Sequence, residues 1–482
     1  MSTPCPLPVA AQHRNLFVFA ACMGLQYLSA PVLYVGITQA SLCQRLGTDN
    51  RVANLPATFF FAMTAMPALI AWLFPHVRQL KPVLSLCYAA MAIVMAFVAL
   101  VLFLQAPPSL VVAAVVLQGA VCGAAGPTAT ALLWEVIGRG TDESRRGVVL
   151  GLAFGVGPIL AVIGSLGQVC LLGGELFGHK FSGLGYPNGF VWLFGLGAPV
   201  MAVGSLLGGI CVVPPPEYEH PRKPIADVMS LCVGLALGFA ALALFFSIPS
   251  GSTQTGWLNR SNLGFALLVG ASLAVIYHFR DILSQRTLLI ATVVTILVYS
   301  GNTIPSNMNL YSEFALGDAP EKFAGLQNTL RFSFKVATGL FLGWLLTRTN
   351  PRAGILTTAG IFVMAQVWAI LATGTAYLVA FGIFGAGELA GVYCPNYILS
   401  ASRKEDYRRA MAFVTMLMVP AAPTGYLYGA IVDALKGEHG AAFAFRTSFA
   451  VAATLILAGI ILALVALPPK PQPTGSGSDG AP

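Results

Sequence analysis

Apolar stretches of 18 or more residues recur along the chain from Asn15 to Leu467, and each is long enough to cross about 30 Å of hydrocarbon. Only 9% of the 482 residues are charged, against roughly 25% in an average soluble domain. The sequence therefore predicts an all-α membrane protein that crosses the bilayer many times, and it excludes an ordinary soluble enzyme.

Proline, glycine and charged residues divide the apolar sequence into fourteen expected spans, numbered 1 to 14. They lie near 16–40, 52–75, 83–105, 109–137, 146–173, 189–213, 229–249, 262–279, 287–311, 323–346, 354–373, 376–399, 409–433 and 446–467. An even number of spans places both termini on one side. Of the 26 Lys and Arg, seventeen fall on the side of the termini, seven on the other side and two inside a span. The positive-inside rule then predicts cytoplasmic termini, and we expect the cell (inner) membrane.

A polar, proline-rich linker at 214–224 follows the sixth span and marks the clearest domain boundary. We expect a six-helix bundle at 1–213, a cytoplasmic linker at 214–228, an inserted helix pair at 229–283 and a second six-helix bundle at 284–467. The Pro-, Gly- and Ser-rich tail at 468–482 is expected to be disordered.

Two short segments occur twice in the same order. The segment AWLF at Ala71 aligns with GWLL at Gly343, and DESRRG at 142–147 aligns with EDYRRA at 405–410. The offsets are 272 residues for the first pair (343 − 71) and 263 residues for the second (405 − 142). We infer two related halves of six spans each, with spans 7 and 8 inserted between them.

This plan resembles the major facilitator superfamily, and the fourteen-span count is similar to its drug:proton antiporter branch. Gly343, Arg348 and Arg352 match part of the family's Gly-x-x-x-Asp-Arg-x-Gly-Arg-Arg loop, with a threonine in place of the Asp. Gly157 and Pro158 match the Gly-Pro motif of its fifth helix. The resemblance implies two bundles with pseudo-twofold symmetry around a central cavity, rocking to expose a midplane site to each side in turn. Spans 1, 2, 4, 5, 9, 10, 12 and 13 would line the cavity, and spans 3, 6, 11 and 14 would be peripheral.

Three ionisable residues fall well inside the expected spans, where a charge costs about 2.5–3.5 kcal/mol on insertion scales. Arg331 and Lys335 lie four residues apart on one face of span 10, and Glu388 lies in span 12. At 1.5 Å per residue, Lys335 and Glu388 both lie about 18 Å below the outer ends of their helices, and Arg331 lies about 12 Å deep. We expect the two cations to bind an anionic group of a substrate and Glu388 to carry a coupling proton. The alternative is a permanent Lys335–Glu388 pair that only ties the two spans together, with Arg331 directed to the lipid headgroups.

Neutral polar residues in other lining spans are further candidate substrate contacts. Asn302 is the deepest of the amides near Pro305 in span 9, where a kink frees backbone carbonyls. In the first half the candidates are Gln26 and Tyr34 on span 1 and Gln118 on span 4. The alternative for each is an ordinary hydrogen bond between helices. The charged candidates for the site, Arg331, Lys335 and Glu388, therefore all lie in the second half of the chain.

Charged residues also cluster where the spans meet the expected cytoplasm. The family resemblance implies that salt bridges there form a latch for one conformation, with the candidates Glu135, Arg146, Arg348, Arg352 and Arg409. The alternative is that these residues set the topology and form exposed ion pairs worth about 0–1 kcal/mol.

Two bases accompany one acid inside the spans, which favours an anionic or zwitterionic solute. With the resemblance, this predicts a proton-coupled secondary active transporter of a small organic solute that works by alternating access. The alternatives are a multidrug:proton exporter and a transporter-like sensor or scaffold that does not transport.

Other classes lack their sequence signatures. No HExxH, GxSxG or P-loop motif occurs, so neither an enzyme nor an ATP-driven pump is expected. The nine cysteines and six histidines are scattered, which indicates neither a disulfide framework nor a metal site, and no cofactor is expected. We expect a monomer whose partners are the solute, membrane lipid and a coupling proton, with no nucleic acid.

Overall fold

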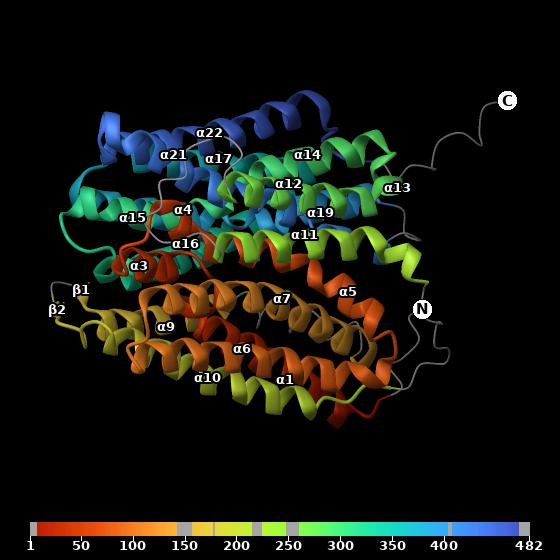
Figure 1. Ribbon diagram of the computed structural model, residues 1–482. Helices are drawn as coiled ribbons and strands as arrows, with labels where there is room; N and C mark the ends of the chain where they lie inside the picture. The colour runs from red at the N-terminus through yellow and green to blue at the C-terminus, as the bar shows by residue number, and fades with distance from the viewer. Residues whose placement is uncertain are drawn as a thin grey trace.

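The computed structural model describes residues 7–141, 157–176, 179–214, 224–246, 260–402 and 407–471. Over these ranges the chain forms a bundle of long helices that run side by side (Figure 1). Helix α1 begins and helix α22 ends at the same end of the bundle, which we call the terminal end (Figure 1). The opposite end, where α3 and the β1–β2 hairpin lie, is called the distal end.

The N-terminal half begins with a helix that is interrupted twice and ends with long, straight helices. Its elements are α1 (Val9–Leu28), α2 (Ala30–Leu33), α3 (Ile37–Arg45), α4 (Asn50–Ala62), η1 (Met63–Ala65), α5 (Met66–Leu73), η2 (Val77–Gln79), α6 (Leu80–Phe103), α7 (Pro108–Gly140), α9 (Gly157–Leu172), β1 (Gly174–Leu176), β2 (His179–Phe181) and α10 (Asn188–Gly209). Strands β1 and β2 pair antiparallel, with Glu175 opposite Lys180.

The inserted pair and the C-terminal half follow. The pair comprises η4 (Ile225–Val228), α11 (Met229–Phe246), α12 (Arg260–His278) and α13 (Arg280–Leu283). The C-terminal half comprises α14 (Arg286–Tyr299), η5 (Ser300–Thr303), α15 (Pro305–Leu316), α16 (Glu321–Arg348), α17 (Pro351–Leu371), η6 (Gly374–Leu378), α18 (Val379–Gly387), α19 (Ala390–Ala401), α20 (Tyr407–Thr415), η7 (Val419–Ala421), α21 (Pro423–His439) and α22 (Ala441–Ala466).

Eleven helices in the described ranges are long and apolar enough to cross a membrane, and each corresponds to one of the fourteen expected spans. The remaining expected spans are 1, 5 and 10. Span 1 is divided into α1, α2 and α3, and span 5 lies partly outside the described residues. Span 10 is the 28-residue helix α16, which is more polar because it carries Arg331 and Lys335. The chain is therefore an all-α membrane protein, and the count of fourteen stays a prediction.

Most helices expected to line the cavity are interrupted, with α7 and α16 as the continuous ones, whereas none of the four helices expected to be peripheral is interrupted. Spans 1, 2, 9, 12 and 13 are interrupted, whereas α6, α10, α17 and α22 run without a break as spans 3, 6, 11 and 14. The apolar stretches of these four helices are 33–50% buried, against 50–72% for spans 2, 4, 9, 12 and 13. Irregular backbone is tolerated at membrane depth only where protein covers it or where it lines a hydrated cavity. The interrupted helices thus belong to the inner ring that the family resemblance implies.

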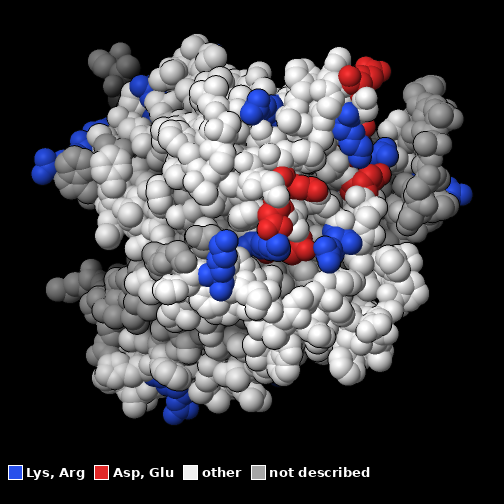
Figure 2. Space-filling model, turned by 90° about the vertical axis from the view of Figure 1, so that its left-hand side faces the viewer, with Lys and Arg blue, Asp and Glu red and all other residues white. Residues whose placement is uncertain are grey.

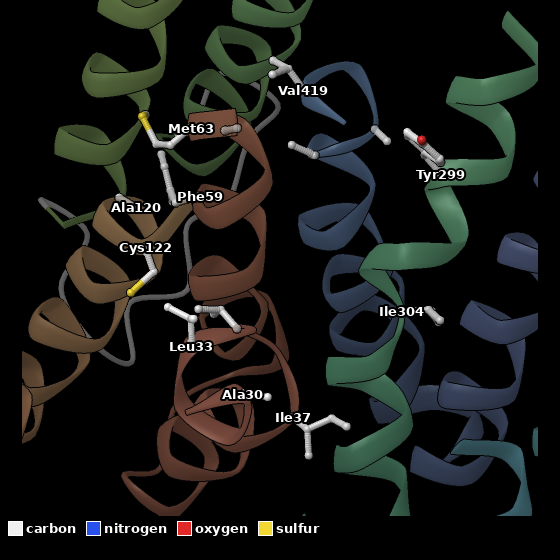
Figure 3. Packing of buried hydrophobic residues seen from close by; sticks show 14 of the residues in the cluster. Ala30, Leu33, Ile37, Phe59, Met63, Ala120, Cys122, Tyr299, Ile304 and Val419 are labelled. Atoms are coloured by element: carbon white, nitrogen blue, oxygen red, sulfur yellow. The ribbon is translucent and has the colours of Figure 1, made fainter. Parts of the chain in front are cut away.

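Small residues allow the closest contacts inside the N-terminal half. A Cβ atom at Gly119 would lie 2.3 Å, and one at Gly123 2.0 Å, from backbone oxygens of α4, so α7 and α4 touch backbone to backbone. The buried side chains of Phe59 on α4 and Ala120 on α7 belong to the apolar cluster around this contact (Figure 3). These two spans therefore pack as one rigid unit.

The inserted pair lies outside the inner ring, where span 2 meets span 13. Helix α11 contacts η1 of the N-terminal half, and α12 contacts η7 and α21 of the C-terminal half. The Ser272 hydroxyl of α12 donates to the Val419 carbonyl at 3.2 Å, which satisfies an acceptor at the η7 interruption. The ring of Tyr426 on α21 packs against Phe245 and Phe265 of the pair. The pair therefore covers the seam between the halves.

Candidate substrate and coupling site

Arg331, Lys335 and Glu388 lie together in the middle of the C-terminal half, and we call them the ion cluster. The Nε of Arg331 donates to Oε2 of Glu388 at 2.9 Å, and Nη2 of Arg331 donates to Oε1. The Nζ of Lys335 lies 3.6 Å from the same Oε2. The side chains of Arg331 and Glu388 are 10% and 11% exposed, and that of Lys335 is 23% exposed. The cluster thus holds two cations around one carboxylate.

A backbone contact between α16 and α18 positions the cluster. A Cβ atom at Gly385 would lie 1.9 Å from the carbonyl oxygen of Arg331, so only a glycine permits this approach. Helix α18 ends at Gly387, and Glu388 begins a turn that leads to α19. Because the two helices touch one turn before Glu388, its carboxylate lies between the two cations of α16.

Aromatic rings surround the cluster from both halves. The guanidinium of Arg331 lies 5.4 Å from the ring centre of Phe332 and 5.6 Å from that of Phe384. From the N-terminal half, the ring centre of Tyr34 lies 6.2 Å from that of Phe332 and 6.0 Å from that of Tyr27. Tyr34 occupies the interruption between α2 and α3, so the break in span 1 supplies the aromatic wall opposite the charges.

The three charges lie together as expected, but their pairing differs from the depth estimate. The equal depths of Lys335 and Glu388 in the sequence predict that these two residues pair. The alternative interpretation also directs Arg331 to the lipid headgroups. Instead Arg331 makes the two-point contact and Lys335 lies farther away. The reason is the local contact at Gly385, which brings α18 against Arg331 itself.

Two of the neutral candidates of the N-terminal half, Gln26 and Gln118, are paired within that half. The amide of Gln26 donates to the Tyr88 hydroxyl at 2.7 Å. The amide of Gln118 donates to the Val32 carbonyl at 2.7 Å and accepts from Gln39 at 3.2 Å. This carbonyl precedes the interruption in span 1, so Gln118 replaces a lost helical donor. No described contact joins Gln26 or Gln118 to the ion cluster, and their role as substrate contacts stays a prediction.

Asn302 lies in η5 on the side of span 9 that faces span 13. Its Nδ2 donates to the sulfur of Met418 at 3.7 Å, and its Oδ1 is buried without a hydrogen-bond partner among the described residues. The neighbouring Thr303 hydroxyl pairs with that of Thr424 at 2.8 Å. A buried acceptor without a partner requires an explanation, and a ligand is one. The substrate role of Asn302 therefore stays a prediction.

The latch candidates lie at the terminal end. Glu135 accepts from the arginine four residues later on α7 at 2.7 Å. Arg352 donates to backbone carbonyls at the end of α22, the nearer at 2.8 Å, and so caps that helix. Arg348 is exposed at the end of α16. These contacts of Glu135 and Arg352 stay within their own halves, while Arg146 and the side chain of Arg409 lie outside the described residues. A terminal latch stays a prediction.

A contact between the halves at the distal end was not foreseen from the sequence. The carboxylate of Asp433, near the distal end of α21, accepts from the backbone N–H groups of Asn50 at 3.2 Å and Arg51 at 2.9 Å. These are the first residues of α4, whose N–H groups have no partner in their own helix. The negative charge also meets the positive end of the helix dipole. We call this contact the distal clasp. An acid at the end of an apolar span was the only sequence signal for it.

Further polar contacts join the halves around the clasp. Gln44 donates to Glu313 at 2.6 Å, Arg45 lies 3.6 Å from Glu321, and deeper in the seam Asn54 donates to Asn307 at 2.7 Å. Acidic and basic side chains gather in the middle of this face (Figure 2). The halves are therefore held together directly at the distal end.

The fold and the ion cluster define an all-α membrane protein with charged side chains inside its helical bundle. Neither a protein-family model nor a curated protein sequence matches the chain. A crystal structure of an auto-inhibited POT family peptide transporter matches with a TM-score of 0.65 and 14% identity, covering 97% of this chain and 99% of the other.

Two further solved structures give the same picture. A POT family transporter in complex with 5-aminolevulinic acid matches with a TM-score of 0.65 and 12% identity, over 94% and 96% of the two chains. A mutant of the nucleoside transporter NupG matches with a TM-score of 0.58 and 12% identity, over 94% and 99%. At such identities the likeness shows the fold alone, and that fold is the major facilitator type.

Proposed function

We propose that the chain is a secondary active transporter that moves a small anionic or zwitterionic organic solute by alternating access, coupled to protons. The ion cluster carries this proposal, because ionisable groups inside membrane spans are costly and mark substrate or proton pathways. The fold supports it, since structures with this fold include peptide and nucleoside transporters.

The charges of the cluster provide a physical route to coupling. With Glu388 ionised, two cations and one carboxylate leave a net charge of +1. Protonation of Glu388 raises this charge, and a bound anion lowers it. Each event therefore favours the other, and the linkage is reciprocal. A site of this kind moves a proton and an anion together.

The distal clasp supplies the conformational part of the proposal. With the terminal end in the cytoplasm, as the distribution of basic residues predicts, this conformation is held closed on the outer side. Opening that side requires Asp433 to release the first turn of α4. The pair formed by Arg331 and Glu388 lies within one half, so rocking of the halves leaves it intact.

A multidrug exporter of organic cations fits the cluster poorly, because two cations flank the acid that such a substrate would need.

An experiment distinguishes a transporter from a protein that senses a solute without transporting it. Purified protein in proteoliposomes is given an imposed pH gradient and pools of metabolites, and solute uptake and internal pH are followed. We expect uptake of a solute that depends on the gradient and is lost in Glu388→Gln, with Glu438→Gln as an exposed control. Absence of any protein-dependent uptake or pH change would favour the sensor.

A further inference from the structure

The two cations of the ion cluster are engaged to different degrees. Arg331 uses two nitrogens on Glu388 and lies between two aromatic rings. The Nζ of Lys335 lies 3.6 Å from the carboxylate, beyond the usual 2.7–3.2 Å of an N–H···O hydrogen bond. Lys335 is also the most exposed member, at 23%. Its ammonium group therefore keeps donors available for another anion.

The carboxylate of Glu388 has little capacity left. Both of its oxygens accept from Arg331, and the backbone contact at Gly385 holds the two helices at this separation. An incoming ammonium group would have to displace a charge-assisted, two-point contact. Protonation of Glu388 does not help, because a neutral carboxyl group offers an ammonium no charge. An incoming carboxylate needs only Lys335.

The balance of charges around the ion cluster also favours an anionic ligand. On the N-terminal side of the cluster, Tyr34 packs against Phe332 with Tyr27 beside it, and a phenol carries no charge at neutral pH. The described acids Glu313, Glu321 and Asp433 make their contacts at the distal end instead. Among the described residues, one positive charge of the cluster is therefore left without a counterion of its own, and keeping such a charge largely out of water is costly. With Glu388 ionised, a single negative charge brings the cluster to neutrality.

We propose that Lys335 is the anion-binding residue of the site, that Arg331 holds the coupling acid Glu388 in place, and that the solute is a singly charged organic anion without an amine, such as a monocarboxylate. This rests on the proposed function and narrows its substrate class. The aromatic wall of Tyr34 and Phe332 suits an apolar body behind the carboxylate.

The test uses matched compounds that differ only in charge. Thermal unfolding of the purified full chain is measured at neutral pH with hexanoate, norleucine and pentylamine, and with phenylpropionate, phenylalanine and phenethylamine. We expect the anion of at least one set to stabilise the protein, with an affinity at least about tenfold above its zwitterion and amine. Lys335→Gln should weaken anion binding about 10- to 100-fold, the loss expected for a charged hydrogen bond.

Two variants guard against a general loss of structure. Lys335→Arg keeps the charge and should retain binding within about tenfold, and Lys180→Gln removes an exposed lysine of β2 and should leave binding unchanged. Equal binding of a zwitterion or amine, unchanged binding in Lys335→Gln, or no binding of either anion overturns the proposal. Uptake of a zwitterion into proteoliposomes would uphold the proposed function and overturn only this inference. Anion binding without transport of any solute would uphold this inference and overturn the proposed transport function.

Discussion

The candidate amides of the N-terminal half are paired within that half, whereas the candidate groups of the C-terminal half have capacity left over. The amides of Gln26 and Gln118 are each paired with a neighbouring helix. In the other half, the ion cluster keeps one unbalanced positive charge, and Asn302 keeps an acceptor without a partner among the described residues. Satisfied buried groups hold a structure together, and unsatisfied ones need a ligand, a water or another conformation. Among the candidate groups, we therefore expect Gln26 and Gln118 to have a structural role and the groups of the C-terminal half to bind the solute.

The largest effect should follow from Glu388→Gln, which leaves two buried cations without their carboxylate. We expect the unfolding free energy to fall by about 3–5 kcal/mol and transport to fall at least about 100-fold. Chemical denaturation in detergent and initial uptake rates in proteoliposomes measure the two effects. Adding Arg331→Met should recover much of the stability without restoring transport. Wild-type stability in the single variant would show that the carboxylate does not hold the cluster.

The next effect concerns the clasp between the halves. Asp433→Asn removes the charge that caps α4, and losing a charged cap costs about 1–2 kcal/mol, or about a tenfold shift toward the distal-open state. Cys43 is buried in α3, which packs against α15 of the other half, and reports this opening. Its rate of labelling by a membrane-impermeant maleimide, read by mass spectrometry, should rise about tenfold. An unchanged rate would remove the clasp from the gating account.

A smaller effect is expected for Gln118, a candidate amide of the N-terminal half. Gln118→Leu removes its hydrogen bond to the Val32 carbonyl and the one it accepts from Gln39, and that carbonyl still accepts from Gln39 at 2.9 Å. We expect a loss of about 1 kcal/mol in unfolding free energy, with the KM for the solute within about twofold of wild type. Denaturation and uptake kinetics test both. A tenfold change in KM would place an N-terminal amide in the binding site and break the comparison.

The smallest effect comes from an ion pair near the distal start of the same helix as the ion cluster. Lys322 lies 2.7 Å from Asp318, both are almost half exposed, and the hydrogen bond from Lys322 holds the pKa of Asp318 below its usual 3.8. A carboxyl group whose pKa is lower in the folded state stabilises the fold at pH values above its unfolded-state pKa. This stabilisation is lost as the pH falls through the folded-state pKa. After solvent screening, Asp318→Asn should cost at most about 0.5 kcal/mol at neutral pH. A larger loss of unfolding free energy would mean that an exposed ion pair stabilises as much as a buried one, and that burial is not what makes the ion cluster important.

The sequence predicts the membrane class and the three charges of the site, because apolar length and intramembrane charge are local signals. It does not predict that Arg331 is the main partner of Glu388, since depth along each helix ignores the contact at Gly385. The role of Gln118 depends on a carbonyl freed by a break in another helix. The distal clasp depends on which helix ends meet, so Asp433 reads as an ordinary acid at the end of a span until the halves are placed together.

The central claim is that the ion cluster couples a solute to protons. Its most direct test is the internal pH of proteoliposomes when the solute is added outside, measured with the wild type and Glu388→Gln side by side. We predict that the wild type acidifies the interior as the solute enters and that the variant moves neither solute nor protons. A Glu388→Gln variant that carries both at the wild-type rate would contradict the account.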